Sequence, residues 1–455
     1  MTIDLRQFFY PLAILLIHFS ALSVISEELR AKKVVKICAQ TDEKIYQLLW
    51  LVNKFQVDLW TQPRAANSCV LAAVDESDNG SSFLEAMNAS LIAYGIKSTS
   101  LQQYLDEILI ESESDAIVNR SQIRSAATPV IFKNYLRYSN IFTLLRDWHR
   151  KNGNRFVLTS IGRSVEGRSI LATTFNSIGP KRDGTQDRAL VIECGIHARE
   201  WISPAICLFI IHELLFNKES SQILEQYRVH IIPILNPDGY VYTWEKNRLW
   251  RKNRSGGQGC RGVDLNRNFD VDFCRVGSSR DPCSETYCGR RAFSEPETQA
   301  FRNFMLAAHN NVPIHVYFSI HSYGQTFTYP YGFTKRQLPD HQQRYKISRE
   351  ANKRMQSLYG ESYSFGQTAK VVYASSGGSD DWTQVALKPK AVYVLESRDK
   401  GRFGFLLPPN MILPAAREAM VAIKSILNSV NDKPETPESV TTPDMNEPLT
   451  QPPSS

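Results

Sequence analysis

The stretch Ala189-Leu-Val-Ile-Glu-Cys-Gly-Ile-His-Ala-Arg-Glu-Trp201 joins a short apolar run to a histidine and a glutamate three residues apart. The apolar run predicts a buried strand over residues 189–193, and a helical pattern follows over residues 203–216. In α/β proteins, ligands gather at the carboxyl ends of such strands. His197 and Glu200 are therefore either metal ligands or two polar residues that happen to end a strand.

The same alternation of strands and helices extends outward from this stretch, from about residue 125 onward. Further apolar strands are predicted at residues 156–159, 229–235, 314–320 and 391–395, and further helices at residues 141–152, 295–308 and 342–359. Continuous apolar strands between helices indicate a sheet that is covered on both faces. We therefore expect an α/β fold over residues 125–431.

The two ends of the chain differ from this central part. Residues 1–26 resemble a cleavable signal peptide, although an uncleaved membrane anchor is the alternative. Residues 27–124 hold short elements, including a strand at 33–38 and a helix at 42–56, and end in a polar linker whose Arg120 and Arg124 a protease could reach. Residues 432–455, rich in Pro, Thr and Ser, predict a flexible tail. With 455 residues, the chain is long enough for several such units.

Composition narrows the class of protein. Hydrophobic residues make up 42% and charged residues 22%, as in ordinary globular proteins. The net charge of +7 comes without a basic and aromatic cluster, so nucleic-acid binding is not expected. The chain has 8 cysteines, which in a secreted protein indicate disulfides; a zinc knuckle is the weaker alternative, because no CxxC pair is present. Sequons that could carry glycans begin at Asn79, Asn88, Asn119 and Asn253.

A catalytic metal site needs more than the HxxE pair. A zinc ion that catalyses hydrolysis has three protein ligands and an open position for water. His321 lies at the end of the predicted strand 314–320, where its side chain can reach a shared cleft with His197 and Glu200. By itself an HxxE pair is a frequent accident, so these residues alone leave the metal site open.

Four longer motifs strengthen the metal interpretation. Tyr242-Thr-Trp-Glu-Lys-Asn-Arg-Leu-Trp-Arg-Lys-Asn-Arg254, Gly262-Val-Asp-Leu-Asn-Arg-Asn-Phe269, Tyr373-Ala-Ser-Ser-Gly-Gly-Ser-Asp-Asp-Trp382 and Leu395-Glu-Ser-Arg-Asp399 resemble, in this order, motifs of the secreted zinc carboxypeptidases of the pancreatic A/B type. The resemblance covers about residues 125–430. It implies a mixed, largely parallel twisted sheet with helices on both faces. The preceding part, with Val57-Asp-Leu-Trp60, resembles the small α+β inhibitory propeptide of that family.

The resemblance also implies the catalytic residues. His197, Glu200 and His321 match the ligands of one zinc ion, the His2Glu set known for this family. Glu396 matches the general base, and Arg251 matches the cation that stabilises the developing oxyanion, with Arg248 assisting from one turn earlier if that segment is helical. Asp264 matches the carboxylate that holds the His197 ring. Lys252 and Arg254, in the same basic run, are expected on a solvated face.

Substrate-binding residues follow from the same resemblance. Asn266 and Arg267 match the pair that holds the substrate's terminal carboxylate, and Tyr373 matches a mobile tyrosine that closes over it. Arg199, Ser322 and Tyr323 match residues of neighbouring subsites. Asp380 stands where B-type enzymes carry a pocket aspartate, which implies release of C-terminal Lys or Arg, unless Asp380 turns away or is satisfied locally.

The expected protein is thus the secreted, monomeric zymogen of a zinc carboxypeptidase, acting on peptide C-termini after a trypsin-like protease cuts at Arg120 or Arg124. The resemblance implies the disulfides Cys194–Cys207, Cys260–Cys283 and Cys274–Cys288, and leaves open whether Cys38 and Cys69 pair. A protein that binds peptide ends without turnover is the alternative, which retention of Glu396 disfavours. A serine hydrolase is not expected, because Gly162-Arg-Ser-Val-Glu-Gly167 misses the GxSxG motif by one residue.

Overall fold

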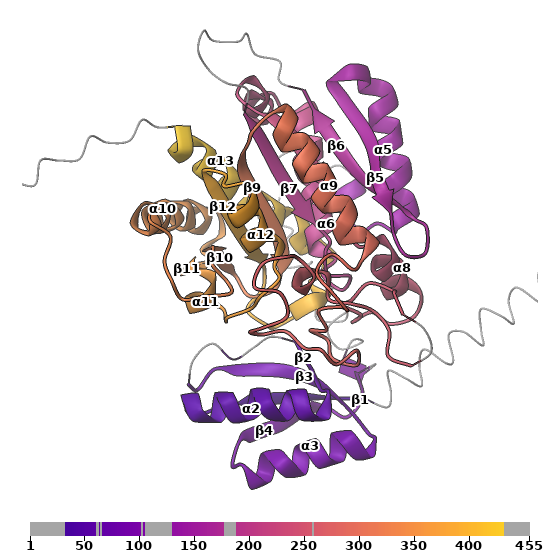
Figure 1. Cartoon of the computed structure of the whole chain (residues 1–455), viewed down its shortest axis with the longest axis vertical. Helices are drawn as coiled ribbons and strands as arrows, with labels where there is room; N and C mark the ends of the chain where they lie inside the picture. Colours follow the sequence, from indigo (N-terminus) through magenta and orange to yellow (C-terminus); the bar gives the residue numbers. More distant parts are fainter. Residues whose placement is uncertain are drawn as a thin grey trace, which may run out of the picture.

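The computed structural model describes residues 32–60, 63, 66–101, 103–104, 130–176, 188–256 and 259–431. They form a small N-terminal unit, residues 32–104, and a larger unit, residues 130–431, that lie against each other (Figure 1). The expected signal peptide, both linker arginines and the Pro/Thr/Ser-rich tail fall outside the described residues. No helix of the described part is long and apolar enough to cross a membrane.

The N-terminal unit is a four-stranded antiparallel sheet with two helices on one face (Figure 1). In the order β2-β3-β1-β4, its strands are β1 (Lys32–Cys38), β2 (Asp58–Leu59), β3 (Cys69–Asp75) and β4 (Ala93–Ser98), and its helices are α2 (Asp42–Phe55) and α3 (Asp78–Ala89). Helix α2 begins where the Thr41 side chain accepts a hydrogen bond from the Lys44 N–H, a common helix start. The expected strand and helix of this region are confirmed.

The larger unit is built on an eight-stranded mixed sheet in the order β11-β10-β12-β9-β7-β8-β6-β5. The four central strands are parallel and the flanking pairs mostly antiparallel. The strands are β5 (Phe156–Arg163), β6 (Ser169–Phe175), β7 (Ala189–Cys194), β8 (Arg228–Ile232), β9 (Ile314–Ser322), β10 (Thr326–Tyr329), β11 (Ser364–Gln367) and β12 (Ala391–Ser397). This confirms the expected mixed, largely parallel α/β sheet.

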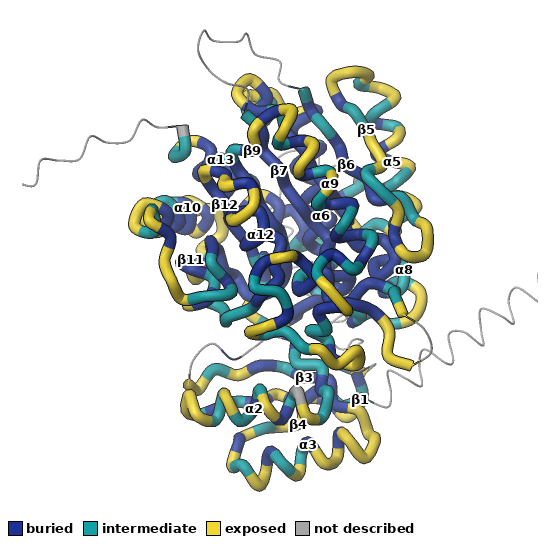
Figure 2. The backbone as a smooth tube through the Cα atoms, viewed as in Figure 1, coloured by how far each residue is buried: buried dark blue, intermediate teal, exposed yellow. Residues whose placement is uncertain are grey.

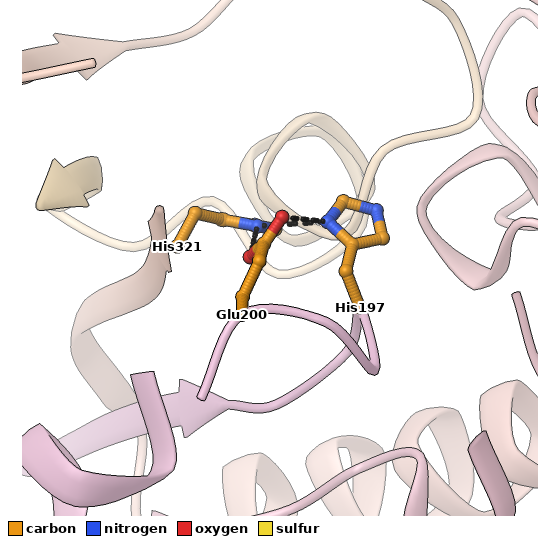
Figure 3. A group of neighbouring side chains, drawn as sticks. All are labelled: His197, Glu200 and His321. Carbon is orange, nitrogen blue, oxygen red and sulfur yellow. Dashed lines mark hydrogen bonds and ion pairs between the residues drawn. The ribbon is translucent and has the colours of Figure 1, made fainter. Parts of the chain in front are cut away.

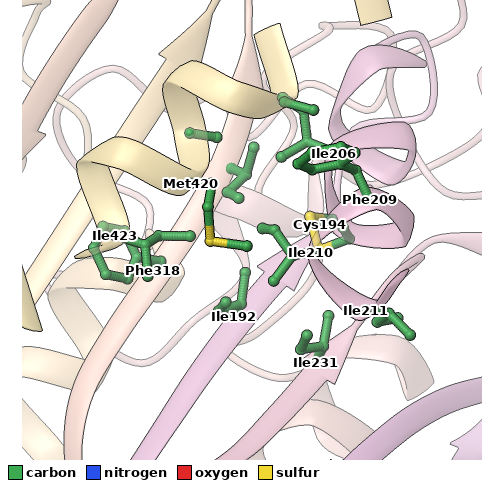
Figure 4. Packing of buried hydrophobic residues seen from close by; sticks show 14 of the residues in the cluster. Ile192, Cys194, Ile206, Phe209, Ile210, Ile211, Ile231, Phe318, Met420 and Ile423 are labelled. Carbon is green, nitrogen blue, oxygen red and sulfur yellow. A yellow bond between two sulfur atoms is a disulfide. The ribbon is translucent and has the colours of Figure 1, made fainter. Parts of the chain in front are cut away.

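Helices cover both faces of this sheet. They are α5 (Tyr138–Asn152), α6 (Ile202–Phe216), α7 (Lys218–Ser221), α8 (Pro237–Glu245), α9 (Pro296–Asn311), α10 (His341–Tyr359), α11 (Thr368–Val371), α12 (Ser379–Ala386) and α13 (Ile412–Asn431). Helix α6 is apolar on nearly all sides and packs with α13 against the central strands (Figure 4). Helices α9 and α12 contribute to the hydrophobic core on the other face, so the sheet is buried between two layers (Figure 2).

Three strands of the larger unit, β6, β10 and β11, were absent from the sequence prediction. Strands β10 and β11 have only four residues each and include Thr, Ser and Gln, so they lack the apolar run that marked the central strands. The predicted strand 229–235 was too long, because β8 ends at Ile232 and Pro233 follows.

All eight cysteines form disulfides. The three implied pairs, Cys194–Cys207, Cys260–Cys283 and Cys274–Cys288, are present. The open question is also answered, since Cys38 and Cys69 bridge the facing ends of β1 and β3.

The two units share a small hydrophobic cluster. Trp60 and Leu101 of the N-terminal unit pack with Leu249, Tyr323 and Phe405 of the larger unit, and all five side chains are buried. Beside them, Arg199 Nη1 donates a hydrogen bond to Asp58 Oδ1 at 2.8 Å. The N-terminal unit therefore covers the edge of the larger unit at which Arg199 lies.

Candidate active site

Predicted metal ligands and the predicted general base lie at or just after the carboxyl ends of three neighbouring parallel strands. His197 lies in the loop after β7, His321 is near the end of β9, and Glu396 is near the end of β12. Glu396 and His321 are direct register partners. The loop turns sharply at Gly195, whose positive φ of 64° suits glycine and whose added Cβ would lie 3.1 Å from the Ile234 Cα.

His197, Glu200 and His321 point toward one another (Figure 3). His197 Nδ1 lies 2.8 Å from Glu200 Oε1, His321 Nδ1 lies 3.0 Å from Glu200 Oε2, and the two Nδ1 atoms are 3.2 Å apart. A tetrahedral zinc ion with bonds of about 2.0–2.1 Å separates its ligand atoms by roughly 3.3 Å. The three side chains, all buried, therefore fit a zinc ion with little rearrangement.

Asp264 holds the outer side of the His197 ring. Its Oδ1 lies 3.2 Å from His197 Nε2, and its Oδ2 accepts hydrogen bonds from Arg251 Nε at 3.0 Å and Nη2 at 2.9 Å. Burial would raise the pKa of Asp264, but the charges of Arg251 and Arg267 and the contact with His197 hold it well below its ordinary value. An ionised Asp264 thus orients both the ring and Arg251.

The His321 ring has an outer partner that sequence reasoning missed. His321 Nε2 lies 2.9 Å from Ser319 Oγ, which donates to Glu193 Oε2 at 2.7 Å. Burial raises the pKa of Glu193, although hydrogen bonds and nearby charge act against this. A glutamate within an otherwise apolar strand was the one signal in the sequence that could have drawn notice.

Beside the metal-ligand group lies a cleft of about 140 Å³. Among its lining residues are nearly all the predicted functional side chains, namely His197, Arg199, Glu200, Arg251, Asn266, Arg267, His321, Ser322, Tyr323, Tyr373, Asp380 and Glu396. Leu59 and Trp60 of the N-terminal unit also line it. Residues remote in sequence thus converge on one space.

Arg267 and Tyr373 form one wall of the cleft. Arg267 Nη2 donates to the Tyr373 hydroxyl at 3.1 Å, and Arg267 Nε is held by the Gly277 carbonyl at 2.8 Å. Asn266 is fixed as well, because its Oδ1 accepts from the Ser379 N–H at 2.9 Å. A guanidinium and an amide held side by side can receive a carboxylate.

Asp380 and Asp381 have different surroundings. Both oxygens of Asp381 accept backbone hydrogen bonds, from Gly332 and Phe333 at 2.9 Å, whereas Asp380 lines the cleft. Burial raises the pKa of Asp380, and N–H groups at the start of α12 oppose that shift. A buried carboxylate at a cleft can pair with a cationic side chain.

The structure corrects the expected exposure of Lys252 and Arg254, and the helical turn on which the expected placement of Arg248 depended is not formed. The segment after α8 is not helical, and Arg248 does not line the cleft; it donates to the carbonyls of Arg199 at 2.8 Å and Phe405 at 2.5 Å. Lys252 is not on a solvated face but buried, with Nζ donating to two carbonyls, and Arg254 stacks on the Tyr242 ring, 3.6 Å from its centroid.

The sequon at Asn253 also has a different role from the one expected. The Asn253 side chain is fully buried, and its Nδ2 donates to Glu295 at 2.8 Å and Glu297 at 3.0 Å. An amide nitrogen held in this way cannot carry a glycan in the folded protein.

The fold places a group of three side chains that could hold a metal ion beside a cleft, an arrangement that metal-dependent hydrolysis requires. Comparison with known proteins specifies the family: the model for zinc carboxypeptidases matches residues 141–422. Carboxypeptidase B of Rattus norvegicus is 32% identical over 419 residues, which cover 90% of this chain and 97% of that protein. Carboxypeptidase A6 of Homo sapiens is 34% identical over 404 residues, which cover 87% and 89%. The solved structure of thrombin activatable fibrinolysis inhibitor matches with a TM-score of 0.72 and 30% identity, over 88% of this chain and 99% of that one.

The chain belongs to the zinc carboxypeptidase family, as its motifs suggested. It is therefore a metallocarboxypeptidase, a hydrolase that acts on the C-termini of peptides, and the family implies zinc as its cofactor. Its relatives include both B-type and A-type enzymes, so membership alone leaves the preferred residue open.

Proposed function

We propose that this chain is the secreted zymogen of a B-like carboxypeptidase that holds one zinc ion and releases C-terminal Lys or Arg. The observation that carries the proposal is Asp380, which is 7% exposed and lines the cleft, while Asp381 beside it is occupied by backbone donors. A substrate ammonium or guanidinium would neutralise Asp380, whereas an aromatic side chain would leave its charge buried and unpaired.

Each remaining residue of the cleft has a role in this reaction. Bound by His197, Glu200 and His321, zinc would supply Lewis-acid activation of water and of the scissile carbonyl. Glu396 takes a proton from the attacking water and delivers it to the departing amine. Arg251, oriented by Asp264, stabilises the negative charge that develops on the carbonyl oxygen.

Exopeptidase action follows from binding of the substrate's terminal carboxylate. Asn266 and Arg267 bind the terminal carboxylate of the substrate, and Tyr373 closes over it. Only a peptide that ends in this cleft satisfies those donors, so internal bonds are not cleaved. Arg199, Ser322 and Tyr323 line the part of the cleft that receives the preceding residues.

The N-terminal unit is the inhibitory propeptide in this proposal. Leu59 and Trp60 stand in the cleft, and Asp58 pairs with Arg199, so the unit occupies space that a peptide chain needs. A trypsin-like protease that cuts at Arg120 or Arg124 would release it. Secretion after removal of residues 1–26, and a monomeric active form, complete the proposal.

The test measures release of the last residue from matched peptides that end in Lys, Arg, Phe, Leu or Glu. Trypsin-treated protein is assayed with and without a zinc chelator, beside a Glu396→Gln variant treated in the same way. We expect chelator-sensitive release of Lys and Arg alone, and a decrease of kcat by about 10²–10⁴ in the variant. Its zinc content should equal that of the wild type.

Two other outcomes would change the proposal in different ways. Release of Phe or Leu in place of Lys and Arg would retain the zinc chemistry and reject the role of Asp380. Tight binding of peptides without any release would favour a protein that captures peptide ends without turnover.

A further inference from the structure

Glu193 is a buried carboxylate that the proposed reaction does not use. It lies in the central strand β7, its side chain is fully buried, and among the residues that the structure describes no lysine or arginine forms a salt bridge with it. Its Oε1 has no hydrogen-bond partner in that part of the chain. Burial of a carboxylate in an apolar sheet costs stability. A function of Glu193 would explain why it is buried there.

Strand register explains which side chains meet Glu193. Its direct partner on β9 is Ser319. Because side chains alternate along a strand, Tyr317, Ser319 and His321 of β9 point to the same face of the sheet as Glu193. Strand pairing thus places the Glu193 carboxylate on the same face of the sheet as His321, a proposed metal ligand.

The hydrogen bonds near Glu193 have a definite direction. His321 turns Nδ1 toward His197 and Glu200; with zinc bound at Nδ1, Nε2 carries the ring hydrogen and donates to Ser319 Oγ, 2.9 Å away. Ser319 in turn donates to Glu193 Oε2 at 2.7 Å. A serine that accepts from the ring must donate elsewhere, and Glu193 is the acceptor.

A second hydroxyl, that of Tyr317, donates to the same Glu193 oxygen. The Tyr317 hydroxyl lies 3.2 Å from Glu193 Oε2 and 3.0 Å from Ser379 Oγ. Tyr317 is the donor toward both oxygens, and because its hydroxyl has one hydrogen it donates to one of them at a time. Ser379 is the first residue of α12 and is followed directly by Asp380.

We propose that Glu193, acting through Ser319, is a positioning residue that fixes the ring orientation and tautomer of His321 for zinc, as Asp264 does for His197. This inference rests on the proposed zinc site. The two carboxylates act in different ways: Asp264 contacts His197 directly, whereas Glu193 acts on His321 through the Ser319 hydroxyl. Loss of such an outer partner typically weakens metal binding by about 10–100-fold.

The experiment measures zinc release into a competing chelator from the full chain at pH 7. The variants are Glu193→Gln, which keeps the shape and removes the charge, Ser319→Ala, which breaks the connection, and the double variant. Glu297→Gln is the matched control, because Glu297 is equally buried but bonds to Asn253 and the Val165 N–H, away from His321. A second readout is the visible spectrum of the cobalt-substituted proteins, which reports the ligand geometry.

We expect zinc affinity to fall about 10-fold or more in both single variants and to fall little further in the double variant, because both act through one connection. Their cobalt spectra should shift together, while Glu297→Gln should keep the wild-type affinity and spectrum. Unfolding of the metal-free proteins separates metal binding from stability, and if Glu193→Gln does not fold, Glu193→Asp, which shortens the side chain that Ser319 reaches, takes its place beside Ser319→Ala.

The inference is overturned if Glu193→Gln and Ser319→Ala bind zinc as the wild type does. It is also overturned if only Ser319→Ala weakens binding, since the serine would then act without Glu193. Peptidase specificity is not needed for either readout, so failure here is distinct from failure of the Lys and Arg preference.

Discussion

At the scale of single residues, the adjacent aspartates give a matched test of specificity. Asp380→Asn removes the charge that faces the cleft, and we expect kcat/KM for peptides ending in Lys or Arg to fall at least about 30-fold, because the substrate cation loses a buried partner. Asp381→Asn is the control. Its oxygens bond to the N–H groups of Gly332 and Phe333, so it should alter thermal stability and leave the preference for Lys and Arg unchanged.

Steady-state kinetics on the peptide series would check this prediction. Equal loss in both variants would mean that the effect passes through α12 as a whole. An Asp380→Asn enzyme that still cleaves Lys peptides at the wild-type rate would show that another group recognises the cation.

At the scale of the element, the loop before α12 depends on one glycine. Gly377 has a φ of 77°, and a Cβ there would lie 2.3 Å from the Arg267 carbonyl oxygen. Its carbonyl also accepts from the Phe269 N–H, and its N–H donates to Val271. We expect Gly377→Ala to push this loop away from Arg267 and raise KM several-fold, together with a loss of stability.

The variant Gly167→Ala is the control for Gly377→Ala, because it introduces backbone strain without a steric contact of the added Cβ. Gly167 has a similar φ of 82°, but nothing lies within 4 Å of its added Cβ. It should lower the free energy of unfolding by about 1–2 kcal/mol from backbone strain alone and leave KM unchanged. Denaturant unfolding and KM are the measurements, and equal KM values for the two variants would contradict the role of Gly377.

Helix α9 carries a pH-dependent group in its first turn. Burial raises the pKa of Glu297 from 4.5 to about 7, although hydrogen bonds from Asn253 and the Val165 N–H oppose the shift. The folded protein thus prefers the protonated form, so this contribution to stability is complete below pH 4.5 and is lost as the pH rises through about 7. The rise in pKa corresponds to roughly 3 kcal/mol.

Glu297→Gln should abolish this dependence. We expect the metal-free wild type to lose free energy of unfolding relative to the variant between pH 5 and pH 8, measured by urea unfolding. Parallel curves for the two proteins would show that Glu297 is ionised in the fold throughout that range.

At the scale of the whole molecule, the contact between the two units controls access to the cleft. Trp60 is 4% exposed and packs against Tyr323 and Phe405 in the shared cluster. We expect Trp60→Ala to raise the peptidase activity of the uncut chain at least about 10-fold, because loss of a buried anchor typically costs 2 kcal/mol or more. Trypsin-treated wild type and variant should be equally active.

Trp50→Ala is the matched control for that experiment. Trp50 is 61% exposed on α2 and outside the shared cluster, so its loss should leave the uncut chain as inactive as the wild type. Activity of the uncut wild type equal to that of the treated protein would reject inhibition by the N-terminal unit.

The central strands and the metal-ligand motif could be predicted from the sequence. Strands β7, β9 and β12 are mostly apolar because they are buried on both faces, and that burial leaves a local pattern. His197 and Glu200 occupy one tight loop after such a strand. Family motifs supplied the remaining cleft residues, which spacing alone did not reveal.

Only the tertiary structure decided which polar side chains are buried and with what partners. Lys252 and Asn253 read locally as surface residues, yet carbonyls and carboxylates 30 or more residues away satisfy them inside the fold. Glu193 meets Ser319 across 126 residues only because β7 and β9 pair in that register. Local sequence records whether a side chain is apolar, whereas a buried polar group depends on donors and acceptors that strand pairing brings from distant parts of the chain.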